Sequence, residues 1–409
     1  MALFGKRKAG DPKRNTDVLE RPDYGWIWKP LLALLVLYLL VTIILGIWWS
    51  QPPSTFDVEQ ATAAQRGDAA EATTQAATTT ASRGAVTTAT LMTTVGTLLE
   101  KPGGYLRNDK MPPGVWLDNM PNWEYGVLRQ ARDLTQSLPA LSEGDEAAFA
   151  EAHERLSANS KDWLYPSAER RYEQALEALE GYLRSLSGEQ GAGFATNGDG
   201  VSRWLSRVEQ RLDSLTHRLS ASVAEREALR DLIDIETGEA PSQTPWYKID
   251  NVFFEARGTG WALIHLLEAV EHDLADVIDA AGATSNWQQL IAELKLTQRR
   301  VWSPVILNGS GFGLFANHSL VMANYTARAR ELAHQLVRQL DGVQVENVDT
   351  TTQPATQPVD EAESGEAPEN QGGDGQDGQD KESGEPEQRS ANGMESEENN
   401  PEDSEGQAG

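Results

Sequence analysis

The chain has 409 residues, with 35 Lys and Arg against 62 Asp and Glu, a formal net charge of -27 and no cysteine. The lack of cysteine excludes disulfide-stabilised folds, thiolate metal sites, iron–sulfur clusters and cysteine nucleophiles. The acidic balance argues against nucleic-acid binding, because a phosphate backbone is repelled unless basic residues are concentrated locally.

The first element is an uncharged, apolar stretch from Leu31 to Trp49. As a helix it is about 28 Å long, close to the roughly 30 Å of a bilayer's hydrocarbon core. Aromatic residues flank both of its ends, as they do at membrane interfaces, and Pro30 fits a first helical turn. We predict a transmembrane helix over residues 30–49 that contacts the lipid bilayer. It should stay uncleaved, because it exceeds a signal-peptide core and no small-residue cleavage site follows.

Basic residues are concentrated before this helix. Residues 1–49 carry 7 basic and 4 acidic side chains, whereas Arg66 is the only basic residue in the thirty or so that follow. The positive-inside rule therefore predicts a cytoplasmic arm over residues 1–29 and places the rest of the chain across the membrane.

Two segments of biased composition enclose the central part of the chain. Residues 50–83 are rich in Ala and Thr, which predicts a flexible linker whose middle can be partly helical. Residues 341–409 carry 2 basic and 20 acidic side chains and no aromatic residue, which predicts a disordered, solvated tail.

Residues 84–340 have helical periodicity almost throughout and predict an all-α, bundle-like domain. Ser167 and the pair Thr244-Pro245 read as helix starts, and Asn119 or Asn122 as the cap of an earlier helix. We expect helices over residues 87–99, 121–138, 142–158, 167–186, 201–219, 244–282, 286–301 and 319–340.

One of these helices carries a coiled-coil-like seam, from Val201 to Leu219. Its apolar residues recur at spacings of 4, 3, 4, 3 and 4. The seam is shorter than three heptads, which favours packing against a neighbouring helix of the same chain. The alternative is an oligomer through Leu205 to Leu219.

Two irregular stretches, residues 101–125 and 302–318, combine Pro and Gly with aromatic residues and Asn. The simpler interpretation is that they cap the ends of the bundle and fill its core. The alternative is a groove for a glycan strand, an extended peptide or another envelope protein. Its candidate residues are Tyr105, Asn108, Asp109, Trp116, Asp118, Asn119, Trp123, Trp302, Asn308, Phe312 and His318.

The segments KPGGYLRNDKMPPGVWLDNMPNWEYG, RLSASV, DNVFFEARGTGWALIHLLEAVE and WSPVILNGSGFGLFANHSLVMANY resemble those of a bacterial inner-membrane family, domain of unknown function 2333. The likeness covers the anchor and most of residues 85–340. It implies a single-pass protein of the Gram-negative cell envelope, and it supplies no catalytic residue.

Titratable side chains offer several catalytic or metal-binding patterns, none of them complete. One helical face carries His265, Glu268, His272, Asp276 and Asp279, which is more typical of a solvated face than of a metal site. Glu331 and His334 lack the second Glu-x-x-His pair of a di-iron bundle. The glycine run at 309–313 is neither a P-loop nor a nucleophile elbow. We therefore predict no metal and no cofactor.

A predicted transmembrane helix followed by a helical domain without a complete catalytic pattern favours a binding or scaffolding role in the cell envelope. A first alternative is a hydrolase acting on cell-wall or lipid material, with its acid and base among Asp109, Asp118 and Glu124. A second is a subunit of a membrane complex.

Overall fold

The computed structural model describes residues 25–70, 82–144, 146–186, 193–221, 244–245, 248–301, 306 and 317–345. Within these ranges every regular element is a helix, and two isolated β-bridges are the only strand-like pairings. This confirms the all-α prediction. The arm and tail predicted at the two ends of the chain lie almost wholly outside the described residues.

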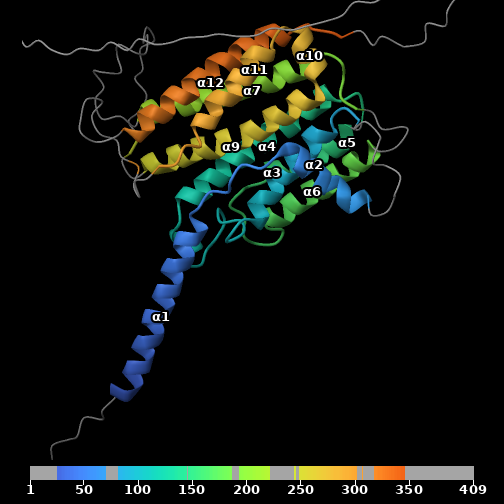
Figure 1. Ribbon diagram of the computed structural model, residues 1–409. Coiled ribbons are helices and arrows are strands. Elements are labelled where there is room, and N and C mark those ends of the chain that lie inside the picture. The colour runs from blue at the N-terminus through green and yellow to red at the C-terminus, as the bar shows by residue number, and fades with distance from the viewer. Residues whose placement is uncertain are drawn as a thin grey trace, which may run out of the picture. The chain divides into compact units, whose positions relative to one another are not determined.

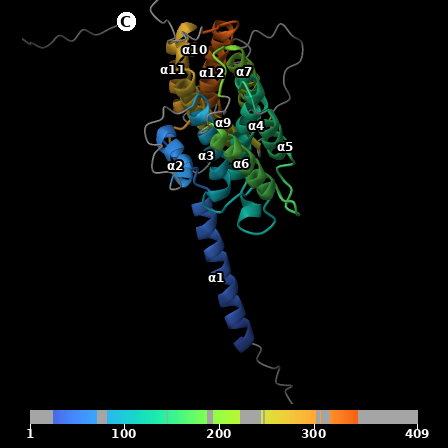
Figure 2. The same cartoon turned by 90° about the vertical axis from the view of Figure 1, so that its right-hand side faces the viewer.

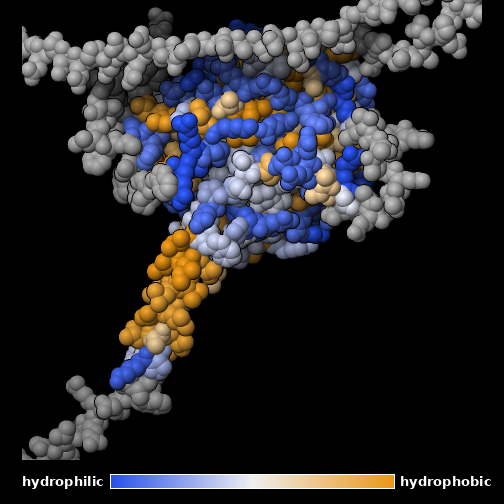
Figure 3. Space-filling view, in the orientation of Figure 1, coloured by the Kyte–Doolittle hydropathy of each residue, from blue (hydrophilic) through white to orange (hydrophobic). Residues whose placement is uncertain are grey.

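The first helix, α1 (Gly25–Trp49), contains the apolar stretch. Residues Trp28–Trp49 are long and apolar enough to cross a membrane. Most of their large side chains are exposed, and Figure 3 shows α1 as a continuous hydrophobic surface beside a mostly hydrophilic domain. So much exposed leucine and isoleucine is unfavourable in water, which makes α1 a candidate membrane-spanning helix.

The domain is a bundle of longer helices around α9, which packs on α4, α3 and α11 (Figures 1 and 2). Helix α12 lies along α7, and α5 pairs with α6 beside α4 and α3. The helices are α3 (Ala85–Glu100), α4 (Asn119–Leu141), α5 (Glu146–Ser157), α6 (Ala168–Ser185), α7 (Asp199–Ser220), α9 (Ile249–Asp273), α11 (Thr284–Leu296) and α12 (His318–Leu340).

The core depends on a close crossing of α4 and α9. A Cβ atom added to Gly126 would lie 2.2 Å from the carbonyl oxygen of Glu255, and one added to Gly258 would lie 2.0 Å from that of Trp123. Only glycine permits this approach from both sides. The large side chains that fill the core include four fully buried tryptophans: Trp123, Trp204, Trp261 and Trp287.

The apolar seam of α7 is buried inside the chain. Leu205, Val208, Leu212, Leu215 and Leu219 are at most 2% exposed. Helix α7 packs against α12 along its length and also against α4. The seam therefore contributes to this domain's own core, and its apolar side chains are not free for another chain.

The first part of the expected linker differs from the prediction. Residues 51–57 lie on the domain, and α2 (Val58–Ala70) packs against α3 and α9. The Phe56 ring stacks on His265 with ring centroids 3.9 Å apart. This aromatic residue and the contacts of α2 together attach the Ala/Thr-rich stretch to the domain. Residues 71–81 lie outside the described part.

Some helix starts were predicted correctly and others were not. The Ser167 hydroxyl accepts a hydrogen bond from the amide of Arg170, as an N-cap should. Helix α4 instead begins at Asn119, with Asp118 at the N-cap position, so neither Asn119 nor Asn122 is its cap. Thr244 is not a cap either, because α9 begins only at Ile249; its hydroxyl donates to the carbonyl of Arg218 at the end of α7.

The expected helix over residues 244–282 is divided in two. Leu274 has φ -127° and ψ 31°, which ends α9 and precedes the short helix α10 (Ala275–Ala280). Helix α11 likewise ends at Leu296, before the predicted end at residue 301, and begins behind Ala283.

Candidate functional site

The candidate site is the end of the domain that meets α1. A Cβ atom on Gly46 would lie 3.7 Å from Cβ of Pro113 and 4.0 Å from Cδ2 of Leu117. Trp49 covers Gly103, where a Cβ would lie 2.7 Å from its ring and where φ is +87°. The last turn of α1 is therefore in contact with the domain itself (Figure 1).

The chain that follows α1 is fastened to α9. Trp261 donates from Nε1 to the carbonyl of Ser54 over 3.2 Å, and the amide of Phe56 donates to Nε2 of His265 over 3.0 Å. Nδ1 of His265 lies 2.7 Å from the Trp261 carbonyl and must carry the proton. Burial lowers the pKa of His265 to about 4, so the ring is neutral near pH 7. The expectation that His265 lies on a solvated face is wrong, because its side chain is fully buried and stacked against Phe56.

Three predicted groove residues of the first irregular stretch are buried. The Tyr105 hydroxyl lies 3.0 Å from the carbonyl of Ser160 and donates to it. Asn108 donates from Nδ2 to the carbonyl of Asp162 and to the carboxylate of Glu169. Trp123 is a residue of α4, and its side chain is fully buried in the core. These side chains fill and tie the interior, as the simpler interpretation expects, and offer no open stacking surface.

The other groove residues of this stretch are divided between a turn and the start of α4. Asp109 lies under Gly114, where a Cβ would be 1.8 Å from its Oδ2, and burial raises its pKa. Asp118 and Trp116 are exposed. The Oδ1 atom of Asn119 is buried without a hydrogen-bond partner.

Most predicted groove residues of the second stretch lie outside the described residues: Trp302, Asn308 and Phe312. His318 is described and is the first residue of α12, with its ring centroid 6.4 Å from that of Phe253. A groove formed jointly by the two stretches therefore stays a prediction.

A cavity of about 590 Å³ adjoins the end of α1, and we call it the junction cavity. The chain that leaves α1 forms part of its wall, and α9 forms another part. Its lining residues are Ser50, Gln51, Pro52, Asn119, Asp250, Phe254, Arg257, Gln298, Arg300, Val301 and Ile306.

Arg257 is the most unusual group in this cavity. Its Nη2 donates to the carbonyl of Gln298 over 3.2 Å, while its Nε is buried without a hydrogen-bond partner. No carboxylate of the described residues lies within 4.0 Å of the guanidinium, and burial lowers its pKa. On the same helix, burial and the nearby Asp118 raise the pKa of Asp250. A partly buried cation without a carboxylate partner is suited to an anionic ligand.

One of the three carboxylates expected for a hydrolase, Glu124, is enclosed in the core. Glu124 is fully buried and lies 2.5 Å from Nζ of Lys101. It also accepts hydrogen bonds from the amides of Leu106 and Arg107. Burial raises the pKa of Glu124 and the Lys101 ammonium opposes the rise. Glu124 thus fastens the loop to α4 and has no access to a substrate.

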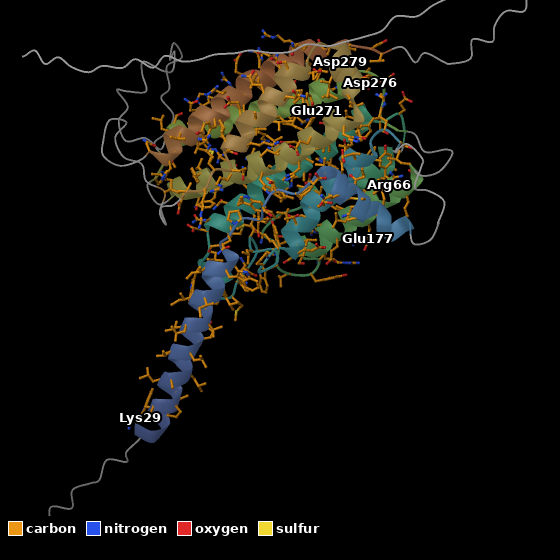
Figure 4. The ribbon with its side chains drawn as sticks, viewed as in Figure 1. Lys29, Arg66, Glu177, Glu271, Asp276 and Asp279 are labelled. Atoms are coloured by element: carbon orange, nitrogen blue, oxygen red, sulfur yellow. The ribbon has the colours of Figure 1, made fainter. Side chains whose placement is uncertain are left out.

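The side chains weighed as metal ligands have other partners. Glu268 pairs with Lys295, and Asp276 pairs with Arg83 over 2.7 Å. His334 lies 3.0 Å from Glu209. Figure 4 shows Asp276 and Asp279 at the end of the domain remote from α1. Across the described ranges, no three His, Asp or Glu side chains are grouped as a metal would need.

Sequence reasoning missed two features of this end. Arg257 gives no signal, because a lone arginine in a helix is ordinary. Trp163, Leu164 and Tyr165 are exposed in a loop, and three consecutive large apolar residues before a proline were a signal that could have been used.

Comparison with known proteins gives a family but no activity. The model of a family described as uncharacterized proteins conserved in bacteria, domain of unknown function 2333, matches residues 22–341. No curated protein and no solved structure matches the chain. The match begins before α1 and includes the residues that had been expected to form a linker. The chain therefore belongs to this bacterial family, as the resemblance of its segments had indicated.

Proposed function

We propose that this chain is a single-pass protein of the bacterial inner membrane whose helical domain binds or scaffolds another envelope component in the periplasm. The support for a membrane anchor is the exposed apolar surface of α1. The support for orientation is the excess of Lys and Arg before α1, with Arg66 alone among the residues that follow.

The observation that carries the proposed role is the contact of α1 with the domain. Gly46 and Trp49 pack on residues 103–117, and Phe56 stacks on His265. No flexible linker therefore separates α1 from the bundle. A domain held in this way is suited to act at the membrane surface. The junction cavity, with Arg257 in its wall, is the candidate place for an anionic ligand.

Reporter fusions test the topology. Alkaline phosphatase fused after Leu340 should be active, and the same reporter fused after Lys29, before the apolar stretch that begins at Leu31, should be inactive. Protease added to spheroplasts should degrade the large C-terminal portion. Recovery of the full-length chain in the soluble fraction, or an active cytoplasmic reporter after Leu340, would contradict the proposal.

Affinity capture of the full chain from crosslinked cells tests the binding role. Specific, repeated recovery of one envelope component supports it, and recovery should fall when Arg257 is replaced by Met if the junction cavity is the site. A zymogram tests the hydrolase alternative, which the burial of Glu124 does not favour. Clearing of a peptidoglycan or ester substrate would reverse that preference.

A further inference from the structure

Exposed large apolar side chains outside α1 are concentrated in two loops, one between α3 and α4 and the other between α5 and α6. Within the described residues, seven such side chains are found outside α1, and Val321 is the one that lies elsewhere. Tyr165 is 87% exposed, Met111 73% and Trp116 61%. We call the six residues of the two loops the apolar patch: Met111, Val115, Trp116, Trp163, Leu164 and Tyr165.

The two loops are fastened to each other through residues just before them. Arg107 donates from Nε to the hydroxyl of Ser160 over 3.0 Å. Asn108 donates to the carbonyl of Asp162 over 2.9 Å, and Tyr105 donates to that of Ser160. The patch therefore rests on a common base of buried and partly buried hydrogen bonds.

The patch lies beside the last turn of α1. Gly46, which contacts Pro113 and Leu117, is three residues before the end of the apolar segment at Trp49. Three residues of helix correspond to about 4.5 Å, so residues 111–117 are level with the place where α1 leaves the hydrocarbon. Figures 1 and 2 both show these loops at the end of the domain from which α1 departs.

The composition of the two loops matches a lipid headgroup layer. Trp and Tyr are enriched at membrane interfaces, where an apolar ring meets a polar tip. Lys110 and Lys161 are exposed and each lies next to one loop, where a long cationic side chain can reach lipid phosphates. Continuity with α1 favours lipid over a protein as the partner, because Pro113 and Leu117, in the loop that carries three residues of the patch, contact the apolar helix at Gly46.

We propose that the apolar patch inserts into the headgroup region of the leaflet from which α1 emerges, so that the domain lies on the bilayer at two places. The proposal rests on the membrane anchoring in the proposed function. It is independent of which side of the membrane the domain occupies and of any envelope partner.

Depth measurement by spin labelling tests this insertion. The natural chain has no cysteine, so single cysteines can be placed in the full-length protein at Trp116→Cys and Tyr165→Cys. Leu37→Cys in α1 is the lipid standard, and Asp279→Cys is the aqueous standard, because Figure 4 shows Asp279 at the end of the domain remote from α1. Each labelled protein is reconstituted in vesicles of phosphatidylethanolamine and phosphatidylglycerol.

The measured quantity is the collision rate of the label with oxygen relative to that with a water-soluble nickel chelate. We expect the ratio at residues 116 and 165 to shift from the Asp279 value toward the Leu37 value. A ratio at both positions equal to that of Asp279 would overturn the insertion, even with Leu37 in lipid and anchoring intact. Protection in native membranes but not in pure lipid vesicles would also overturn it and would indicate a protein partner.

Two controls keep the result decisive. Met111→Cys and Leu164→Cys provide a second pair of positions if a label at 116 or 165 lowers the midpoint of thermal unfolding. If Leu37 itself proved accessible to the nickel chelate, membrane anchoring by α1 would fail together with the insertion. The experiment therefore separates failure of the patch from failure of the proposed function.

Discussion

The imidazole of His265 stacks on the ring of Phe56, with centroids 3.9 Å apart and ring planes at 9°, although 209 positions separate the two residues. The same imidazole accepts the Phe56 amide hydrogen at Nε2. Protonation of Nε2 would remove that acceptor and place a charge among buried groups. The attachment of the chain after α1 to the domain therefore depends on a neutral histidine.

This histidine should make the domain sensitive to acid. Its pKa is about 4 when folded, against 6.5 for an ordinary histidine, so the unfolded chain binds more protons between these values. The contribution of His265 to stability is therefore complete above pH 6.5 and is lost as the pH falls toward 4. Between pH 7 and pH 5 we expect the free energy of unfolding to fall by about 2 kcal/mol from this group.

Chemical denaturation of the detergent-solubilised protein at the two pH values measures the effect. In His265→Phe, which keeps a ring but cannot titrate, this part of the pH dependence should disappear. His272→Asn, at an exposed position of the same helix, is the matched control and should keep it. Equal pH dependence in the wild type and His265→Phe would contradict the assignment.

The crossing of α4 and α9 should not tolerate a methyl group. Gly258→Ala would place Cβ 2.0 Å from a backbone oxygen of Trp123, and Gly126→Ala would place one 2.2 Å from that of Glu255. Because backbone atoms cannot move aside locally, each change should cost about 1–3 kcal/mol of unfolding free energy. In contrast, Gly181→Ala in α6 meets nothing within 4 Å and should stabilise the protein by about 0.5–1 kcal/mol. Thermal or urea unfolding of the three variants checks the contrast in sign.

The ion pair between Lys101 and Glu124 should be strongly coupled, because both side chains are at most 2% exposed. Lys101→Met or Glu124→Gln alone leaves one buried charge without its partner, which should cost about 3 kcal/mol. The double variant should cost less than the sum. A double-mutant cycle measures the coupling, and the exposed pair of Arg155 and Glu151 is the control, with a coupling of about 0.5 kcal/mol or less. Strict additivity at Lys101 and Glu124 would show that the pair contributes nothing.

Arg257 should be a destabilising residue in the ligand-free protein. Its side chain is partly buried with no ion pair among the described residues, so Arg257→Met should raise the free energy of unfolding by about 1 kcal/mol. Arg211→Met is the matched control and should have the opposite sign, because Arg211 pairs with Asp133 over 2.7 Å. Loss of stability in Arg257→Met would mean that the contacts of its side chain outweigh the cost of its burial.

Local signals predicted much of the fold. Ser167 begins a helix because its hydroxyl accepts an amide hydrogen three residues ahead, and the seam of α7 is visible as a repeat along a single helix. Both signals, the cap and the seam, come from residues that are close together in the sequence. The apolar length of α1 is likewise a property of one continuous stretch, which a sequence shows directly.

The errors concern contacts between distant residues. Phe56 has no periodic neighbours, and its partner His265 is remote in sequence, so nothing local showed that residues 51–70 attach to the domain. His265 was assigned to a solvated face because its neighbours on that face of the helix are polar, whereas Phe56 from the chain after α1 covers it. The groove residues Tyr105 and Trp123 could not be distinguished from core residues by composition alone.

The packing of Trp49 over Gly103 has a consequence for what this domain can encounter. In the proposed arrangement, with α1 in a bilayer, a domain packed directly on this helix stays within a layer of space about as thick as the bundle itself. The proposed partners would then have to come to that layer: a neighbouring membrane protein, a lipid-linked precursor, or a soluble component delivered to the surface of the bilayer.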